Sequence, residues 1–112
     1  MNKDKLIISF FINKENIKDN ECEKVKKIVN KNIISGSEYL FDNIFRSEYS
    51  ITYKINSEEV INSNEDYEKL KKILSKIQNV SNDSYVIFYN INDQTSIKIW
   101  KDSQGNFYIK NL

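Results

Sequence analysis

A short stretch near the end of the chain, Asp-Ser-Gln-Gly-Asn at residues 102–106, constrains the fold more than any other feature of the sequence. Gly105 follows three turn-forming residues and lies between two apolar runs. This pattern is typical of a three-residue β-hairpin loop whose glycine adopts the left-handed conformation. Asp102 and Asn106 then close the loop. This loop type fixes the register between the strand before it and the strand after it.

The register divides the hairpin side chains between two faces, because side chains alternate along a strand. Trp100 is expected opposite Tyr108, and Lys98 opposite Lys110, so one face is aromatic and basic. The other face is apolar, and we expect it to pack into the core; it comprises Ile97, Ile99, Phe107 and Ile109.

The preceding run, residues 85–91, is almost entirely apolar and is typical of an interior strand. Its connection to the hairpin leaves two registers open. A three-residue loop would place Ile87 and Tyr89 on the core face, whereas a two-residue loop would exchange them for Val86 and Phe88.

Two strands are predicted in the first half of the chain. Residues 5–13 are apolar on both faces, as in an interior strand, and residues 50–56 alternate between apolar and polar side chains. Residues 37–47 fit either a helical stripe or a strand that turns back into the next one, and we favour the strand.

Two amphipathic helices complete the predicted secondary-structure elements. Residues 20–33 show helical spacing behind Asn20 and Glu23, which have the spacing of a capping box. The second helix is predicted to begin at Ser63 and Asn64 and to end near Asn79; its apolar stripe comprises Tyr67, Leu70, Ile73, Leu74 and Ile77.

The order of these elements predicts a single α+β domain over residues 1–112. We expect a mainly antiparallel sheet with two helices on one face, in a ferredoxin-like β-α-β-β-α-β arrangement with a C-terminal β-hairpin extension. This architecture does not by itself indicate a function.

The composition limits which catalytic and metal-binding sites the chain can form. The chain has no histidine, which excludes Ser-His and Cys-His pairs and histidine-ligated zinc. The single Cys22 falls on the apolar stripe of the first helix, which favours a small core residue. We therefore expect a protein that is not an enzyme and that has no cofactor and no metal.

A cytoplasmic location is expected, because a lone thiol suits a reducing compartment. The apolar run at residues 6–12 is too short to cross a membrane, so we expect no membrane contact. Abundant Ile, Asn and Lys, with no Ala and no Pro, indicate an A/T-rich genome, such as that of a low-GC bacterium or its phage.

Two candidate binding surfaces emerge. The first is the aromatic and basic hairpin face, for which structural packing, protein contact and nucleic-acid stacking all remain open. The second is the acidic centre, residues 38–68, since the segment 32–68 holds eight acidic and two basic side chains. It would suit a partner with a basic surface; its candidate residues are Glu38, Asp42, Glu48, Tyr49, Glu58 and Glu59.

By elimination, we predict a small cytosolic protein that acts by stoichiometric binding to another protein. Inhibitory, immunity and phage-encoded anti-defence proteins act in this way. The alternative is a nucleic-acid-binding module that uses the hairpin face, although the net charge of +1 is low for such a module.

Overall fold

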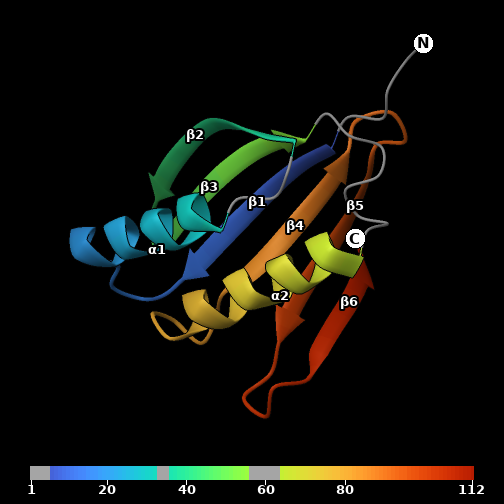
Figure 1. The fold of residues 1–112 in the computed structure, drawn as a ribbon. Coiled ribbons are helices and arrows are strands. Elements are labelled where there is room, and N and C mark those ends of the chain that lie inside the picture. Colours follow the sequence, from blue (N-terminus) through green and yellow to red (C-terminus); the bar gives the residue numbers. More distant parts are fainter. Residues whose placement is uncertain (1–5, 33–35, 56–63) are drawn as a thin grey trace.

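The computed structural model describes residues 6–32, 36–55 and 64–112, with side chains of the second helix from Glu68 onward. The described part forms a single α+β domain (Figure 1). Its elements in chain order are β1 (Leu6–Asn13), α1 (Asp19–Lys31), β2 (Ser37–Phe45), β3 (Glu48–Ile55), α2 (Asn64–Gln78), β4 (Tyr85–Asn90), β5 (Thr95–Lys101) and β6 (Phe107–Asn111).

The six strands form one sheet in the order β2-β3-β1-β4-β5-β6, and every neighbouring pair is antiparallel. β1 lies at the centre between β3 and β4, which confirms the interior positions predicted for β1 and β4. β2 and β6 are the two edge strands.

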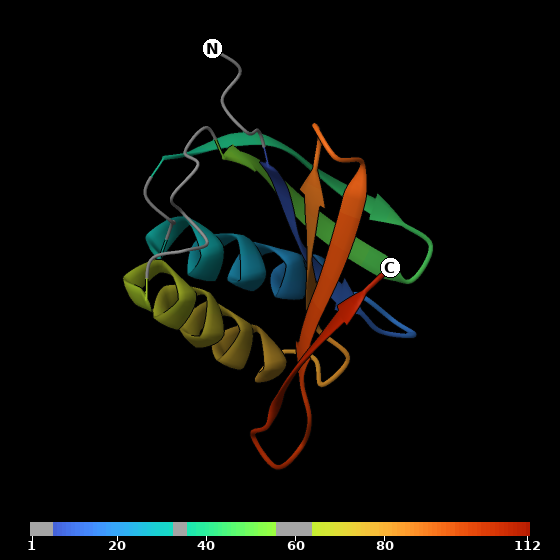
Figure 2. The same cartoon turned by 90° about the vertical axis from the view of Figure 1, so that its right-hand side faces the viewer.

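One hydrophobic core joins the sheet to both helices. Along β1 every second side chain is buried, because alternate residues point to the same side of a strand. α1 contributes Cys22, Val25 and Val29, and α2 contributes Leu70, Ile73, Leu74 and Ile77. Figure 2 shows the two helices next to each other and beside the curved sheet. We call the side of the sheet that these buried side chains leave free the outer face.

The start of α1 differs from the predicted capping box. The helix begins at Asp19, and the residue before it, Lys18, makes no side-chain capping bond. Asn20 therefore lies inside the first turn, where its side chain is not placed to cap. At the other end, the Asn32 side chain donates to the Ile28 carbonyl at 2.8 Å, and the helix ends at Lys31.

The ambiguous segment 37–47 forms the strand β2 and a turn, as favoured from the sequence. A β-bulge interrupts its pairing with β3 between Tyr39 and Phe41. The turn into β3 contains Arg46 in the left-handed conformation, with φ 56°.

The connection from β4 to β5 resolves the register that the sequence left open. Asn90 pairs with Thr95, so the loop has an even number of residues, and Val86 and Phe88 face the core.

The prediction that Ile109 packs into the core is wrong, because its side chain is 58% exposed. It lies on the edge strand β6, which has a neighbour on one side only.

No helix in the part of the chain that the structure describes is long and apolar enough to cross a membrane.

Candidate functional site

The β5–β6 hairpin adopts the predicted register and brings the predicted aromatic residues together. Trp100 pairs with Tyr108, and Lys98 pairs with Lys110. In the turn, the Asp102 amide donates to the Asn106 carbonyl at 2.9 Å, and Gly105 has φ 90°. The turn chemistry of the sequence thus positions the aromatic side chains.

A layer of aromatic rings lies on the outer face of β1, β4, β5 and β6. Trp100 stacks on Tyr108 with ring centroids 5.5 Å apart, and Phe11 stacks on Tyr85 with centroids 4.8 Å apart. The Lys98 ammonium lies over both Tyr85 and Trp100, 4.5 and 5.4 Å from their ring centroids. We call this set the aromatic face: Phe11, Tyr85, Lys98, Trp100 and Tyr108.

Carboxylates hold the two tyrosines of the aromatic face. The Tyr85 hydroxyl donates to Glu48 at 2.8 Å, and the Tyr108 hydroxyl donates to Asp102 at 2.9 Å. Burial, followed by the bond to Glu48, raises the pKa of Tyr85. The backbone amide of Asn106, with help from Tyr108, lowers the pKa of Asp102. Each ring is therefore anchored at its hydroxyl by a carboxylate of the same chain.

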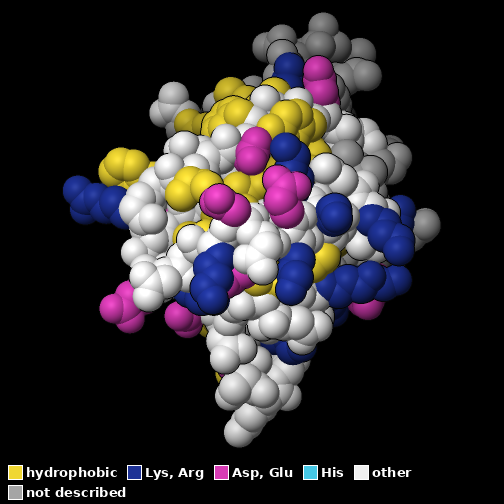
Figure 3. All heavy atoms as spheres, turned by 90° about the vertical axis from the view of Figure 1, so that its left-hand side faces the viewer, with side chains coloured by type: hydrophobic (Ala, Val, Ile, Leu, Met, Phe, Trp, Pro, Cys, Tyr) yellow, Lys and Arg dark blue, Asp and Glu magenta, His cyan; other side chains and the backbone are white. Residues whose placement is uncertain are grey.

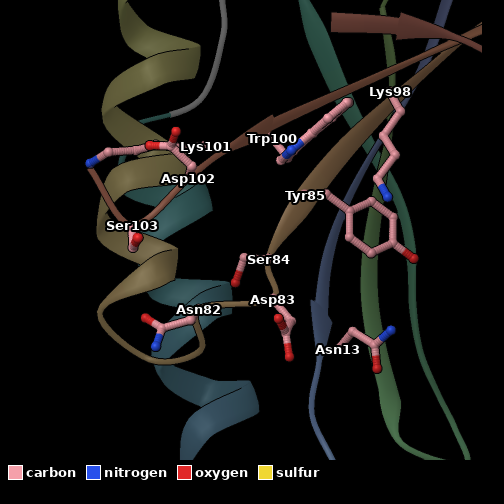
Figure 4. A pocket seen from close by; sticks show the side chains of 10 residues that line it. All are labelled: Asn13, Asn82, Asp83, Ser84, Tyr85, Lys98, Trp100, Lys101, Asp102 and Ser103. Atoms are coloured by element: carbon pink, nitrogen blue, oxygen red, sulfur yellow. The ribbon is translucent and has the colours of Figure 1, made fainter. Parts of the chain in front are cut away.

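A hollow of about 490 Å³ lies beside the aromatic face, between the turn after α2 and the β5–β6 hairpin (Figure 4). Its charged side chains balance: Lys98 and Lys101 are basic, whereas Asp83 and Asp102 are acidic. The other lining residues are Asn13, Asn82, Ser84, Tyr85, Trp100 and Ser103. Its volume is in the range of sites that take a small molecule or a single partner side chain.

Lys98 and Lys110, the predicted basic members of this site, differ in what surrounds them. Lys98 is partly buried against two aromatic rings, whereas Lys110 is exposed on the edge strand. Lys98 is therefore part of the packed aromatic face, and Lys110 is at its rim.

The predicted acidic residues do not form one surface. Asp42 accepts hydrogen bonds from Tyr39 at 2.6 Å and Tyr49 at 3.1 Å, and its carboxylate lies 3.7 Å from the Lys26 ammonium. The Tyr39 bond is the main cause of the lowered pKa of Asp42. The prediction that Tyr49 contacts a partner is wrong, because its side chain is 1% exposed and cannot reach a partner in the folded chain.

The remaining acidic candidates are separate from this cluster. Glu48 bonds to Tyr85 and so belongs beside the aromatic face, and Glu38 is exposed on β2. Glu58 and Glu59 lie outside the described residues. Among the acidic candidates within the described residues, Glu48 is therefore the one that lies beside the aromatic face.

Sequence reasoning missed a second surface, the exposed apolar side chains of edge strand β2. Five of them are between 39% and 64% exposed: Tyr39, Leu40, Phe41, Ile44 and Phe45. Figure 3 views the molecule from the β2 side, and hydrophobic side chains gather there. Their spacing resembles that of a buried strand, so the local pattern of β2 does not indicate that these side chains are exposed.

Cys22 is buried in the core, and this burial raises the pKa of its thiol. Among the described residues, no group of three or more acidic or cysteine side chains is placed to hold a metal ion.

No family model matches the chain, and no curated protein matches it. One solved structure with a similar arrangement is a de novo designed protein, Foldit4. It is 13% identical, with a TM-score of 0.45 over 78% of this chain and 93% of the designed one.

Proposed function

We propose that the protein binds another protein in a stoichiometric complex, and that the aromatic face is the main contact surface. The observation that carries this proposal is the interleaving of aromatic rings with carboxylates. Tyr85 bonds to Glu48, and Tyr108, which stacks on Trp100, bonds to Asp102.

Such a surface has the features of a protein-binding hot spot. Tryptophan and tyrosine supply the largest share of binding energy in many protein interfaces. Trp100 and Tyr85 are partly buried and stacked, so little side-chain entropy remains to be lost when a partner binds. The adjacent hollow offers space for one side chain of the partner.

The charge pattern favours protein over nucleic acid. Phosphate contacts come from basic side chains, and carboxylates nearby repel the phosphate charge. Here Asp83 and Asp102 balance Lys98 and Lys101 around the hollow, and Glu48 adds a further negative charge beside Tyr85. These carboxylates would accept hydrogen bonds from a basic or amide side chain, so we propose a partner with a basic surface.

The experiment is capture of partners by the tagged protein from a nuclease-treated lysate of its source. We expect a protein to be retained at a 1:1 ratio by the wild type and lost with Trp100→Ala. Truncation of a central tryptophan should weaken binding by about 2 kcal/mol or more. Lys110→Ala is the matched control at the rim and should retain the partner. Equal capture by wild type and Trp100→Ala would refute the proposal for this surface.

Nucleic-acid binding is the second candidate function, favoured by Lys98 and Lys110 beside the stacked Trp100 and Tyr108. Bases stack on aromatic side chains, and lysines contact phosphates. Nuclease treatment separates the candidates, because it removes only a partner that is retained through nucleic acid.

We further propose that the protein is not an enzyme and that it acts in the cytoplasm, as an inhibitory, immunity or phage-encoded protein does. The absence of histidine and the buried position of the single thiol support this proposal.

For the fold, we propose a ferredoxin-like core with both helices on one face and β5–β6 as an added hairpin. The strand order β2-β3-β1-β4 and the common core of α1 and α2 support it.

A further inference from the structure

The four charged side chains that line the hollow beside the aromatic face balance in number but not in direction. Lys101 follows Trp100 in β5 and so points to the opposite side of the sheet. Its ammonium donates to the Ser75 hydroxyl of α2 at 3.3 Å and lies 6.0 Å from the Phe107 ring centroid. Among the described residues that line the hollow, Lys98 is therefore the cation that faces it.

The charge of Lys98 is offset at its own end of the hollow. Its ammonium lies 4.5 Å from the Tyr85 ring centroid and 5.4 Å from that of Trp100, an arrangement that stabilises a cation. The Tyr85 hydroxyl donates to Glu48 at 2.8 Å, which brings a carboxylate to the same ring. The rings and Glu48 thus compensate Lys98 within the chain.

The two carboxylates of the hollow differ in what their oxygens already bind. Asp102 accepts hydrogen bonds at 2.9 to 3.3 Å from the Gln104 amide, the Asn106 amide and side chain, and the Tyr108 hydroxyl. These bonds fill the acceptor sites of a carboxylate. The Asp83 side chain is exposed, and no described residue donates a hydrogen bond to its carboxylate or forms an ion pair with it. Asp83 is therefore the acceptor that remains open.

Neutral side chains with free acceptors border Asp83. In the view of Figure 4, Asp83 lies between Asn82 and Asn13, whose side-chain amides bond to no described residue. The turn after α2 sets this position, because the Asp83 amide donates to the Ser81 hydroxyl at 3.3 Å and that hydroxyl donates to the Asn13 carbonyl at 3.1 Å. Tyr85 forms the adjacent wall. The open carboxylate thus lies beside further acceptors and an aromatic ring.

We propose that an arginine side chain of the protein partner enters this hollow and pairs with Asp83; this inference rests on the proposed function and names the partner's group at the same site. A guanidinium binds a carboxylate through two parallel hydrogen bonds and keeps donors for neighbouring amide oxygens. Its flat head and aliphatic stem pack on aromatic rings such as those of Tyr85 and Trp100. A lysine ammonium is a compact charge that makes neither the paired bonds nor the stacking contact.

Blocked tripeptides test the chemistry of the hollow on the full chain without a partner. The probes are Gly-Arg-Gly, Gly-Lys-Gly and Gly-Glu-Gly at constant ionic strength, and the emission of Trp100, the only tryptophan of the chain, reports binding. We expect saturable binding of the Arg peptide with a dissociation constant of about 1 mM. The Lys peptide should bind roughly fivefold more weakly, and the Glu peptide should show no saturable binding.

Asp83→Asn removes the charge and keeps the shape of the side chain. Because the Asp83 carboxylate bonds to no described residue, the variant should unfold at the wild-type urea midpoint. It should raise the dissociation constant of the Arg peptide roughly tenfold. Asp93→Asn is the matched control, because Asp93 is exposed in the β4–β5 turn and does not line the hollow. It should bind the Arg peptide as the wild type does.

The captured partner provides the second measurement. Asp83→Asn should raise the dissociation constant of the complex roughly tenfold or more, and Asp93→Asn should not change it. Equal affinity of Asp83→Asn and the wild type, for the Arg peptide or for the partner, would overturn the inference. So would a Lys or Glu peptide that binds as tightly as the Arg peptide, or the absence of saturable Arg-peptide binding.

The Trp100 variant separates these failures from that of the proposed function. Where Asp83→Asn has no effect but capture of the partner still requires Trp100, the arginine inference fails and the proposed function stands. Capture that does not require Trp100 overturns the proposed function itself, whatever the peptides do.

Discussion

Trp100 and Tyr108 stack across the β5–β6 ladder with their ring planes 19° apart, and the Tyr108 hydroxyl is held by Asp102 at 2.9 Å. The stack covers one side of the only tryptophan in the chain. Its emission therefore reports the state of the aromatic face.

The first prediction concerns this emission. Trp100 is partly buried, so its fluorescence should be intermediate in wavelength and only partly quenched by iodide. Tyr108→Ala uncovers the indole and should shift the emission to longer wavelength with stronger quenching. Tyr89 is an exposed tyrosine of β4 that pairs with Ser96 and not with Trp100, so Tyr89→Ala serves as the control. Identical quenching in both variants would show that Tyr108 does not cover Trp100.

The second prediction contrasts two isoleucines that face each other across one ladder. Ile99 is 5% exposed and its partner Ile109 is 58% exposed. Ile99→Ala should lower the free energy of unfolding by roughly 2–5 kcal/mol, whereas Ile109→Ala should cost less than about 1 kcal/mol. Urea denaturation measures both. Leu74→Ala should match Ile99→Ala, because Leu74 is fully buried.

The third prediction is a loss of stability at high pH. Burial raises the pKa of Tyr53 from 10.0 to about 12. The folded state thus holds the phenol proton more tightly than the unfolded state. The contribution of the Tyr53 phenol to the free energy of unfolding is fully present below about pH 10 and is lost as the pH rises through about 12. Urea midpoints measured between pH 9 and pH 12 should decline, and the decline should be shallower in Tyr53→Phe. An equally steep decline of the urea midpoint in the wild type and in Tyr53→Phe would contradict this prediction.

The fourth prediction tests the glycine of the hairpin. Gly105 has φ 90°, and a Cβ there would meet only the end of the Lys101 side chain at 3.7 Å. The cost of Gly105→Ala is therefore conformational, about 1 kcal/mol in thermal or urea unfolding. Gly105→Asn should cost less, since asparagine tolerates the left-handed region better. A neutral Gly105→Ala would mean that the turn relaxes to another type.

The fifth prediction separates protein binding from nucleic-acid binding. If the aromatic face contacts protein, single-stranded DNA should bind weakly, and Lys98→Ala and Lys110→Ala should not change its salt dependence. If it contacts nucleic acid, each substitution should remove a phosphate contact and flatten the dependence of affinity on salt. Fluorescence anisotropy at several salt concentrations distinguishes the two outcomes.

The β5–β6 hairpin could be predicted from the sequence because its register depends on local chemistry. Gly105 and Asp102 favour one loop, and that loop fixes every pair that follows. The β4–β5 connection lacks such a signal. Its left-handed residue is Gln94, with φ 55°, and no glycine indicates where the turn lies.

Burial on the edge strands could not be predicted for a different reason. Ile109 on β6 and Phe41 on β2 have apolar side chains, yet they are more than half exposed. Which strands lie at an edge depends on the order of the whole sheet, and local patterns do not contain that order. The same holds for the hollow beside Trp100, because it is built from segments as distant as Asn13 and Ser103.

The central position of β1 has a consequence for the synthesis of this chain. β1 is translated before both of its ladder partners, since Leu6 pairs with Ile55 on one side and with Asn90 on the other. A ribosome adds about 5–20 residues per second, so this apolar strand waits for seconds before both neighbours exist. The nascent chain therefore passes through a stage in which its most hydrophobic strand is accessible to chaperones.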